Sequence, residues 1–127
     1  MSTEVGTDIV SVPRIAALVR SRGDTFLPRW FTPAEIGYCA AKAHPSRHLA
    51  ARIAAKEAVL KALPFSTGGP LPWRSIEIMT DADGTPSVRL SGAVLEAARE
   101  AAVGRIRVSL SHCDEYATAV ALVEAGR

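Results

Sequence analysis

The stretch Arg52-Ile53-Ala54-Ala55-Lys56-Glu57-Ala58-Val59-Leu60-Lys61-Ala62 decides the fold, because it forms the middle of the longest regular helix that the sequence predicts. We expect this helix to start at a cap on Ser46 and to run to Leu63, where Pro64 ends it. Its apolar residues fall on one stripe: Leu49, Ile53, Leu60 and Leu63. Lys56 falls inside that stripe, so its amine either reaches past the apolar surface to water or has an anionic target. Arg52 points to nearly the same side, which gives the helix two adjacent cations suited to phosphate.

The segments on either side predict a mixture of helices and strands. Strands are expected over residues 5–12, 73–79, 86–90, 105–111 and 116–123, and helices over residues 14–22, from a capping box at Thr32-Pro33-Ala34-Glu35, and over 92–103. A short link joins strands 73–79 and 86–90, and another joins strands 105–111 and 116–123. We therefore expect each of these two pairs to form an antiparallel hairpin. The expected class is α+β, a mostly antiparallel sheet packed against a long central helix, with residues 1–127 forming one domain.

Length and composition exclude several classes of protein. The chain has 127 residues, of which 48% are hydrophobic and 22% charged, as is typical of a folded globular protein. Cys39 and Cys113 are too few for a disulfide framework and lack the spacing of metal ligands. Glu4 and Asp8 interrupt the only apolar stretch near the start, and no apolar run is long enough to span a bilayer. We therefore expect a cytoplasmic protein that does not enter membranes.

The positive charge is concentrated in one part of the chain. Residues 13–56 hold eight basic side chains and only two acidic ones, a balance of +6. The basic residues are Arg14, Arg20, Arg22, Arg29, Lys42, Arg47, Arg52 and Lys56. Because the whole chain carries +2, the remainder sums to −4. Such segregation indicates an acidic partner or a phosphate-rich ligand, or else an ordinary solvated basic face. Nucleic acid is disfavoured, because the arginines are not interleaved with aromatic residues and no nucleic-acid-binding motif is present.

Three positions could carry chemistry, and each also has a structural interpretation. Asp8 lies in an apolar strand, so it either caps a loop at the strand end or binds a hard cation such as Mg²⁺. Glu57 and Lys61 are four residues apart on one flank of the helix, as in a surface ion pair or in a site. His112 begins a tight turn after a strand, where it either forms a structural hydrogen bond or contacts phosphate.

Taken together, these positions resemble one family. The segments Val5–Val10, Arg52–Ala62 and Val108–His112 occur in the order and spacing of the three signature blocks of holo-acyl-carrier-protein synthases, the small 4′-phosphopantetheinyl transferases. The resemblance runs from about Val5 to Val123. The first two blocks are highly specific as a pair, whereas the third alone would mean little. The chain departs from the family pattern at Ile53, where an aromatic residue is usual, at Cys113, where serine is common, and in a proline-rich loop over residues 66–72.

The resemblance implies a Mg²⁺-dependent transfer of the phosphopantetheine arm of coenzyme A to a serine of an acidic acyl carrier protein, with release of adenosine 3′,5′-bisphosphate. It places the metal ligands at Asp8 and Glu57, the catalytic residues at Glu57 and Lys61, the phosphate contacts at Arg52, Lys56 and His112, a glycine loop near the cofactor at Gly68 and Gly69, and carrier docking at Arg14, Arg20 and Arg22. Either Glu57 or a metal-bound water would take the serine proton. The carrier could serve fatty acid or polyketide synthesis.

The resemblance also implies a homotrimer with coenzyme A sites at the subunit interfaces. A chain this small offers little concave surface for so extended a ligand, and the strand over residues 116–123 is apolar on both faces. Alternatively, both faces of that strand are covered within one subunit. Two other functions compete with the transferase: a metal-dependent phosphate-ester hydrolase that uses the same carboxylates, and a non-catalytic basic module in which Glu57 and Lys61 form only a surface ion pair.

Overall fold

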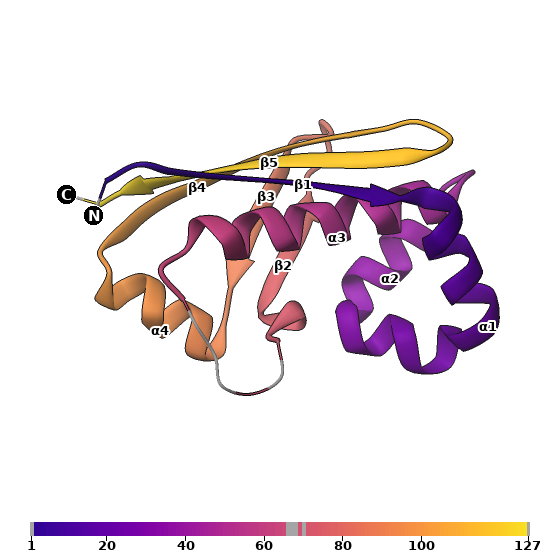
Figure 1. The fold of residues 1–127 in the computed structure, drawn as a ribbon, viewed down its shortest axis with the longest axis horizontal. Coiled ribbons are helices and arrows are strands. Elements are labelled where there is room, and N and C mark those ends of the chain that lie inside the picture. The colour runs from indigo at the N-terminus through magenta and orange to yellow at the C-terminus, as the bar shows by residue number, and fades with distance from the viewer. Residues whose placement is uncertain (1, 66–68, 70, 127) are drawn as a thin grey trace.

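The computed structural model describes residues 2–65, 69 and 71–126 and confirms the α+β class (Figure 1). In chain order, the elements are β1 (Glu4–Ser11), α1 (Val12–Trp30), α2 (Pro33–Ala40), α3 (Pro45–Ala62), a short 3-10 helix (Trp73–Ser75), β2 (Ile76–Thr80), β3 (Pro86–Leu90), α4 (Gly92–Glu100), β4 (Val103–His112) and β5 (Tyr116–Ala125). In Figure 1 the sheet of β1, β5 and β4 forms the upper layer and α3 runs beneath it. Helices α1 and α2 lie at one end of the molecule and α4 at the other.

Both predicted hairpins are confirmed, and they belong to two separate sheets. Strands β1, β5 and β4 form an antiparallel sheet in the order β1-β5-β4, and β2 pairs with β3 in a second, two-stranded sheet. Asp8 lies opposite Ala119 in the register of β1 with β5. Because Ala119 is buried, this register turns Asp8 toward the face of the sheet that α3 covers.

Helix α3 is buried around most of its circumference rather than along the single predicted stripe. Between Leu49 and Ala62, only Glu57, Leu60 and Lys61 escape full burial. The many alanines of this helix allow the surrounding elements to approach closely. A Cβ atom on Gly6 would lie only 2.0 Å from the carbonyl oxygen of Ala58, so β1 and α3 meet backbone to backbone. This contact brings Asp8 directly against the helix that carries Glu57 and Lys61.

The helix termini confirm one prediction and correct two. The capping box is present, because the Glu35 amide donates to Thr32 Oγ1 and the Thr32 amide donates to the Glu35 carboxylate. The predicted cap at Ser46 is wrong: α3 begins at Pro45, and its capping residue His44 makes no side-chain hydrogen bond. Helix α1 continues beyond its predicted end, although its backbone leaves helical geometry at Arg22, where the prediction stopped.

The face of the sheet opposite α3 is exposed and carries apolar residues between threonines and serines. Val5 and Ile9 from β1 and Tyr116 and Val120 from β5 are between 47% and 65% exposed, and no described helix covers them. We call these four residues the open face. In the part of the chain that the structure describes, no helix has the length and apolar character needed to cross a membrane.

Candidate active site

Asp8, Glu57 and Lys61 meet between β1 and α3, as the sequence predicted for residues of one site. The Lys61 ammonium donates to Asp8 Oδ1 at 2.9 Å and to the Thr7 carbonyl oxygen at 3.0 Å. The second carboxylate oxygen, Asp8 Oδ2, is buried, and no donor among the described residues reaches it. When Glu57 is ionised and shares no proton with Asp8, this buried oxygen has no donor and is available to a ligand.

The two carboxyl groups have opposite pKa shifts. Burial raises the pKa of Glu57 to about 7, assisted by the hydrogen bond and the negative charge of Asp8, while Lys61 and Arg14 oppose the shift. Burial would also raise the pKa of Asp8, but hydrogen bonds from Glu57 and Lys61 outweigh it and hold that pKa below its usual value. The hydrogen bond to Asp8 raises the pKa of Lys61. The pair therefore shares a proton near neutral pH, and Glu57 is the group that holds it.

This pair fits a magnesium ion that is also held by a substrate. No cluster of three or more His, Cys, Asp or Glu side chains arranged to hold a metal occurs among the described residues. Mg²⁺ is commonly bound through only one or two carboxylates, with the remaining oxygens supplied by substrate phosphates and water. Asp8 and Glu57 supply two such carboxylates, one with an unused buried oxygen. The donor set therefore suits Mg²⁺ in the presence of a phosphate ligand.

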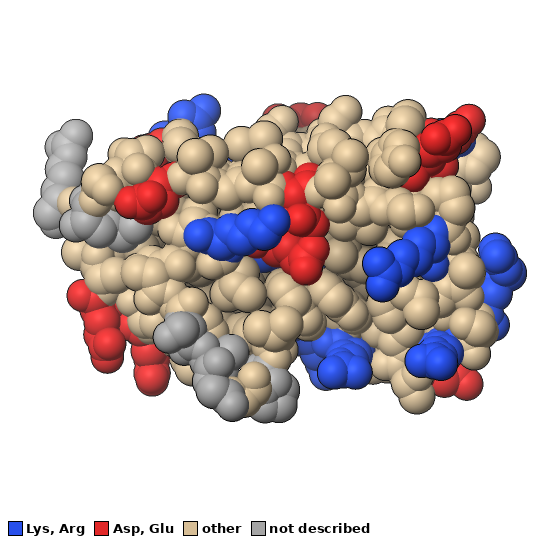
Figure 2. All heavy atoms as spheres, in the orientation of Figure 1, with Lys and Arg blue, Asp and Glu red and all other residues tan. Residues whose placement is uncertain are grey.

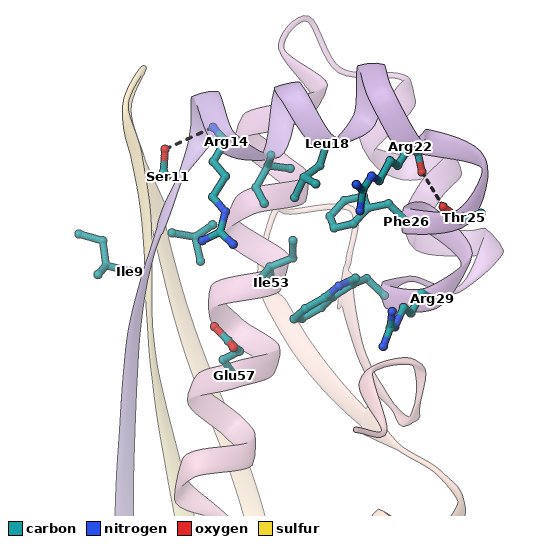
Figure 3. A pocket seen from close by; sticks show the side chains of 13 residues that line it. Ile9, Ser11, Arg14, Leu18, Arg22, Thr25, Phe26, Arg29, Ile53 and Glu57 are labelled. Carbon is teal, nitrogen blue, oxygen red and sulfur yellow. Dashed lines mark hydrogen bonds between the residues drawn. The ribbon is translucent and has the colours of Figure 1, made fainter. Parts of the chain in front are cut away.

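A cleft of about 470 Å³ opens beside Glu57, between α1, β1 and α3 (Figure 3). Its lining combines an apolar floor with basic residues of α1. The apolar part includes Ile15, Leu18, Phe26, Trp30 and Ile53, and the basic part is Arg14, Arg22 and Arg29. In Figure 3 the side chains of Arg14 and Glu57 point toward each other from α1 and α3. Trp30 stacks on Trp73 with ring centroids 4.3 Å apart, which fixes the far end of the cleft.

Two of the three predicted docking arginines reach this cleft. Arg14 and Arg22 line it, whereas Arg20 does not. Arg29, which also lines it, was not among the predicted docking residues, although its place in the basic segment was a signal for it. In the orientation of Figure 1, Figure 2 shows most of the basic side chains over the end that holds α1, with some acidic ones among them, and more acidic side chains near α4. The charge segregation seen in the sequence is thus partly kept in space.

Arg52 and His112 come together in a second, smaller pocket of about 240 Å³ between α3, β4 and the β2–β3 hairpin. Arg52 Nη2 donates to Thr80 Oγ1 at 2.9 Å, while Arg52 Nε is buried without a partner. The pocket also contains Tyr38 and His48, which sequence reasoning missed. The ring of His48 lies 4.9 Å from that of His112, and burial, followed by the charge of His112, lowers the pKa of His48.

The prediction that Lys56 contacts phosphate is wrong. Its side chain is fully buried, and its ammonium donates to Glu35 Oε1 at 2.8 Å and to the carbonyl oxygens of Trp73 at 2.9 Å and Ile76 at 2.8 Å. These three bonds use all three donors of the ammonium group. Burial lowers the pKa of Lys56, although Glu35 opposes the shift. Lys56 is therefore a structural cation of the core.

The two pockets lie on different sides of α3. Arg52, which lines the second pocket, is five residues before Glu57, which lines the first, and nine before Lys61; these spacings correspond to rotations of roughly 140° and 180° around a helix. The first pocket is bounded by α1 and β1 and the second by β4 and the β2–β3 hairpin. Of the two predicted loop glycines, Gly68 falls outside the described residues, and Gly69 lies in a bend between α3 and the 3-10 helix.

Comparison with known proteins identifies the family. The sequence model of the 4′-phosphopantetheinyl transferase superfamily matches residues 4–121. The chain belongs to this family. Within it, the chain is 49% identical over 121 residues to a holo-[acyl-carrier-protein] synthase from Moorella thermoacetica, an alignment that covers 95% of this chain and 93% of the relative. The transferase is also 44% identical to the corresponding protein of Chlamydia muridarum over 120 residues, or 94% and 93% of the two chains.

Solved structures agree with this assignment. The transferase matches the holo-[acyl-carrier-protein] synthase of Neisseria meningitidis with a TM-score of 0.84 and 34% identity, covering 95% and 97% of the two chains. It matches a coenzyme A complex of the Chronobacterium ammoniagenes protein with a TM-score of 0.83 and 31% identity over 100% of both chains. The enzyme class expected from the sequence, a phosphopantetheinyl transferase, is confirmed.

Proposed function

We propose that this enzyme transfers the phosphopantetheine arm of coenzyme A to a serine of an apo acyl carrier protein and releases adenosine 3′,5′-bisphosphate, with Mg²⁺ as cofactor. The observation that carries the proposal is the unpartnered, buried Oδ2 of Asp8 beside Glu57 and Lys61. When bound there, Mg²⁺ would neutralise the diphosphate of coenzyme A and fix its orientation for in-line displacement. The named relatives, and the neighbour that binds coenzyme A, support the choice of substrates.

Different residues of this chain would take up the proton, stabilise the leaving group and bind phosphate. The serine oxygen forms a bond to the phosphorus next to pantetheine, and the bond from that phosphorus to the adenosine bisphosphate breaks. Glu57 would take up the serine proton. Its pKa of about 7 is that of the site without Mg²⁺, and a bound Mg²⁺ would lower it and keep the carboxylate ionised. Lys61, held 2.9 Å from Asp8 Oδ1, places a positive charge where the leaving phosphate develops negative charge. Arg52 and His112 would hold a phosphate of the same ligand.

We further propose that each complete site forms between two subunits of a homotrimer. One coenzyme A molecule must contact Lys61 and Arg52, yet these residues point to opposite sides of α3. A neighbouring subunit that presents its Arg52 pocket to the Asp8–Lys61 side would complete the site. The open face supports this assembly, because four large exposed apolar residues gathered on two neighbouring strands are typical of a surface that is covered by another chain.

The basic cleft would receive the carrier protein. Arg14, Arg22 and Arg29 surround an apolar floor that ends at Glu57, so an acidic partner docked there would bring its serine toward the reacting phosphorus. The reaction is expected in the cytoplasm, and this location stays a prediction.

Intact-mass analysis of an apo carrier protein incubated with this enzyme, coenzyme A and Mg²⁺ tests the proposal. We expect the carrier to gain the mass of one phosphopantetheine group. EDTA should prevent the gain and added Mg²⁺ should restore it, and a carrier whose acceptor serine is replaced by alanine should stay unmodified. Breakdown of coenzyme A without any carrier protein would instead indicate a hydrolase. Full transfer in EDTA would contradict the metal assignment.

A further inference from the structure

Arg52 holds a positive charge in the protein interior without the partner that such a charge normally needs. Its exposed fraction is only 3%, and no ion pair between Arg52 and a carboxylate is present among the described residues. A buried charge is costly unless it is paired and hydrogen-bonded. The single side-chain hydrogen bond from Nη2 to Thr80 leaves Nε buried without an acceptor. Something other than a carboxylate must stabilise and orient this guanidinium group.

Besides Thr80, the Arg52 guanidinium group contacts the aromatic ring of Tyr38. The Arg52 guanidinium carbon lies 4.2 Å from the centroid of the Tyr38 ring, well within the range of a cation–π interaction. Tyr38 comes from α2, whereas Arg52 comes from α3, so the contact joins two helices at the wall of the small pocket. The Lys42 ammonium lies 4.5 Å from the same ring centroid. One aromatic ring therefore faces two cations at the place where a phosphate is expected.

We propose that Tyr38 is a positioning residue for coenzyme A: its ring holds the Arg52 guanidinium in place so that the free N–H donors of Arg52 meet a phosphate of the ligand. Without the ring, the arginine side chain would have more orientations to lose on binding, which weakens affinity without changing the chemical step. This inference rests on the proposed function, because the ligand of the pocket is coenzyme A.

The phenol oxygen of Tyr38 offers a different explanation for its presence. Burial would raise the pKa of Tyr38, but the hydrogen bond with Thr80, followed by the contact with Lys42 and the charges of Lys42 and Arg52, lowers it. The hydroxyl group therefore has a contact of its own. Tyr38→Phe keeps the ring face and removes this contact, so it separates the two explanations. Tyr38→Leu and Tyr38→Met remove the ring face and keep an apolar side chain in a half-buried position.

The test is a comparison of steady-state kinetics of these three variants with the wild type, alongside their melting temperatures. We expect the Leu and Met variants to raise KM for coenzyme A about threefold to thirtyfold, the range of a cation–π contact. Their kcat and their KM for the carrier protein should change by less than about twofold. The Phe variant should retain the wild-type KM.

Two outcomes would overturn the inference. One is an unchanged KM for coenzyme A in a Leu or Met variant that folds, because Tyr38 would then serve packing only. The other is an equal rise in KM for the Phe variant, because the hydroxyl group would then be responsible. A wild-type protein that transfers nothing would instead count against the proposed function, so the two failures are distinguishable.

Discussion

The ion pair of Lys61 with Asp8 lies at the edge of the proposed active site, where one partner is open to solvent. The Lys61 side chain is 57% exposed, whereas the Asp8 side chain is 15% exposed. An ion pair with one solvated partner contributes little to stability. We therefore expect the lysine to leave Asp8 readily for a phosphate ligand, and its main contribution to be to the proposed reaction and not to stability.

Replacing Lys61 by alanine should reduce turnover far more than it weakens coenzyme A binding. Its charge matters most as the leaving phosphate departs, and removal of one such stabilising group typically lowers kcat by about 10²–10³-fold. Steady-state kinetics with an apo carrier protein measures both effects, and Lys61→Arg should recover part of the rate. Normal turnover with only a raised coenzyme A requirement would make Lys61 a binding contact.

Glu57 predicts how the stability of the metal-free enzyme depends on pH. Its folded-state pKa, about 7, lies above the ordinary value of 4.5. The folded protein therefore keeps a proton that the unfolded chain has lost, and stability declines as pH rises from about 4.5 through 7. Thermal melts in EDTA should show this decline, and Glu57→Gln should make it shallower. An unchanged pH profile in the Gln variant would mean that another group is responsible.

At the scale of elements, the sequence predicted the features that depend on local interactions and missed those that depend on tertiary packing. The capping box of α2 was predictable, because Thr32 and Glu35 are three residues apart and interact locally. The class, both hairpins and the meeting of Asp8 with Glu57 and Lys61 also followed from local patterns and the family blocks. Lys56 was misjudged, because its partner Glu35 lies 21 residues away and tertiary packing decides the contact.

Two residues of the smaller pocket, His48 and Tyr38, also differ in whether the sequence could have indicated them. His48 stands four residues before Arg52, so helical spacing was a usable signal for it. Tyr38 gave no such signal, because only the packing of α2 against α3 brings its ring to Arg52. Long-range contacts of this kind have no periodicity in the sequence.

The buried pair of Lys56 and Glu35 should be important for stability. Lys56→Met leaves the Glu35 carboxylate buried without its cation, a change that typically costs about 3–5 kcal/mol. Glu35 still accepts hydrogen bonds from the amides of Thr32 and Ile78, so adding Glu35→Gln should recover part of the loss. Urea denaturation measures the free energy of unfolding. Arg99→Met, at an exposed position of α4, should change it by less than about 0.5 kcal/mol.

At the scale of the whole molecule, the open face should hold the subunits together. Val120→Asp places a charge among apolar residues that the proposed trimer buries, so it should produce monomers and abolish transfer while the far-UV circular dichroism stays unchanged. Light scattering and activity at equal concentration test this. Ser87→Asp, at an exposed position of β3, is the matched control. A fully active wild-type monomer would disprove the shared site.

The basic cleft should recognise the carrier protein through charge. Arg22→Glu should raise KM for the carrier roughly fivefold at low salt and leave KM for coenzyme A almost unchanged. The effect should shrink at high salt, because exposed charges are screened within about 8–10 Å at physiological ionic strength. Arg14→Glu is a less selective test, because Arg14 also lowers the pKa of Glu57. Arg20→Glu, outside the cleft, should have a smaller effect, and an equal effect would place docking elsewhere on α1.

The stack of Trp30 on Trp73 allows the cleft to be monitored by intrinsic tryptophan fluorescence. These are the only two tryptophans of the chain, so fluorescence excited at the red edge of indole absorption comes entirely from this stack. Trp30 lines the cleft, whereas Trp73 is buried behind it. A partner that enters the cleft will change the surroundings of one ring and not of the other. Carrier binding can therefore be followed in real time with the unlabelled enzyme.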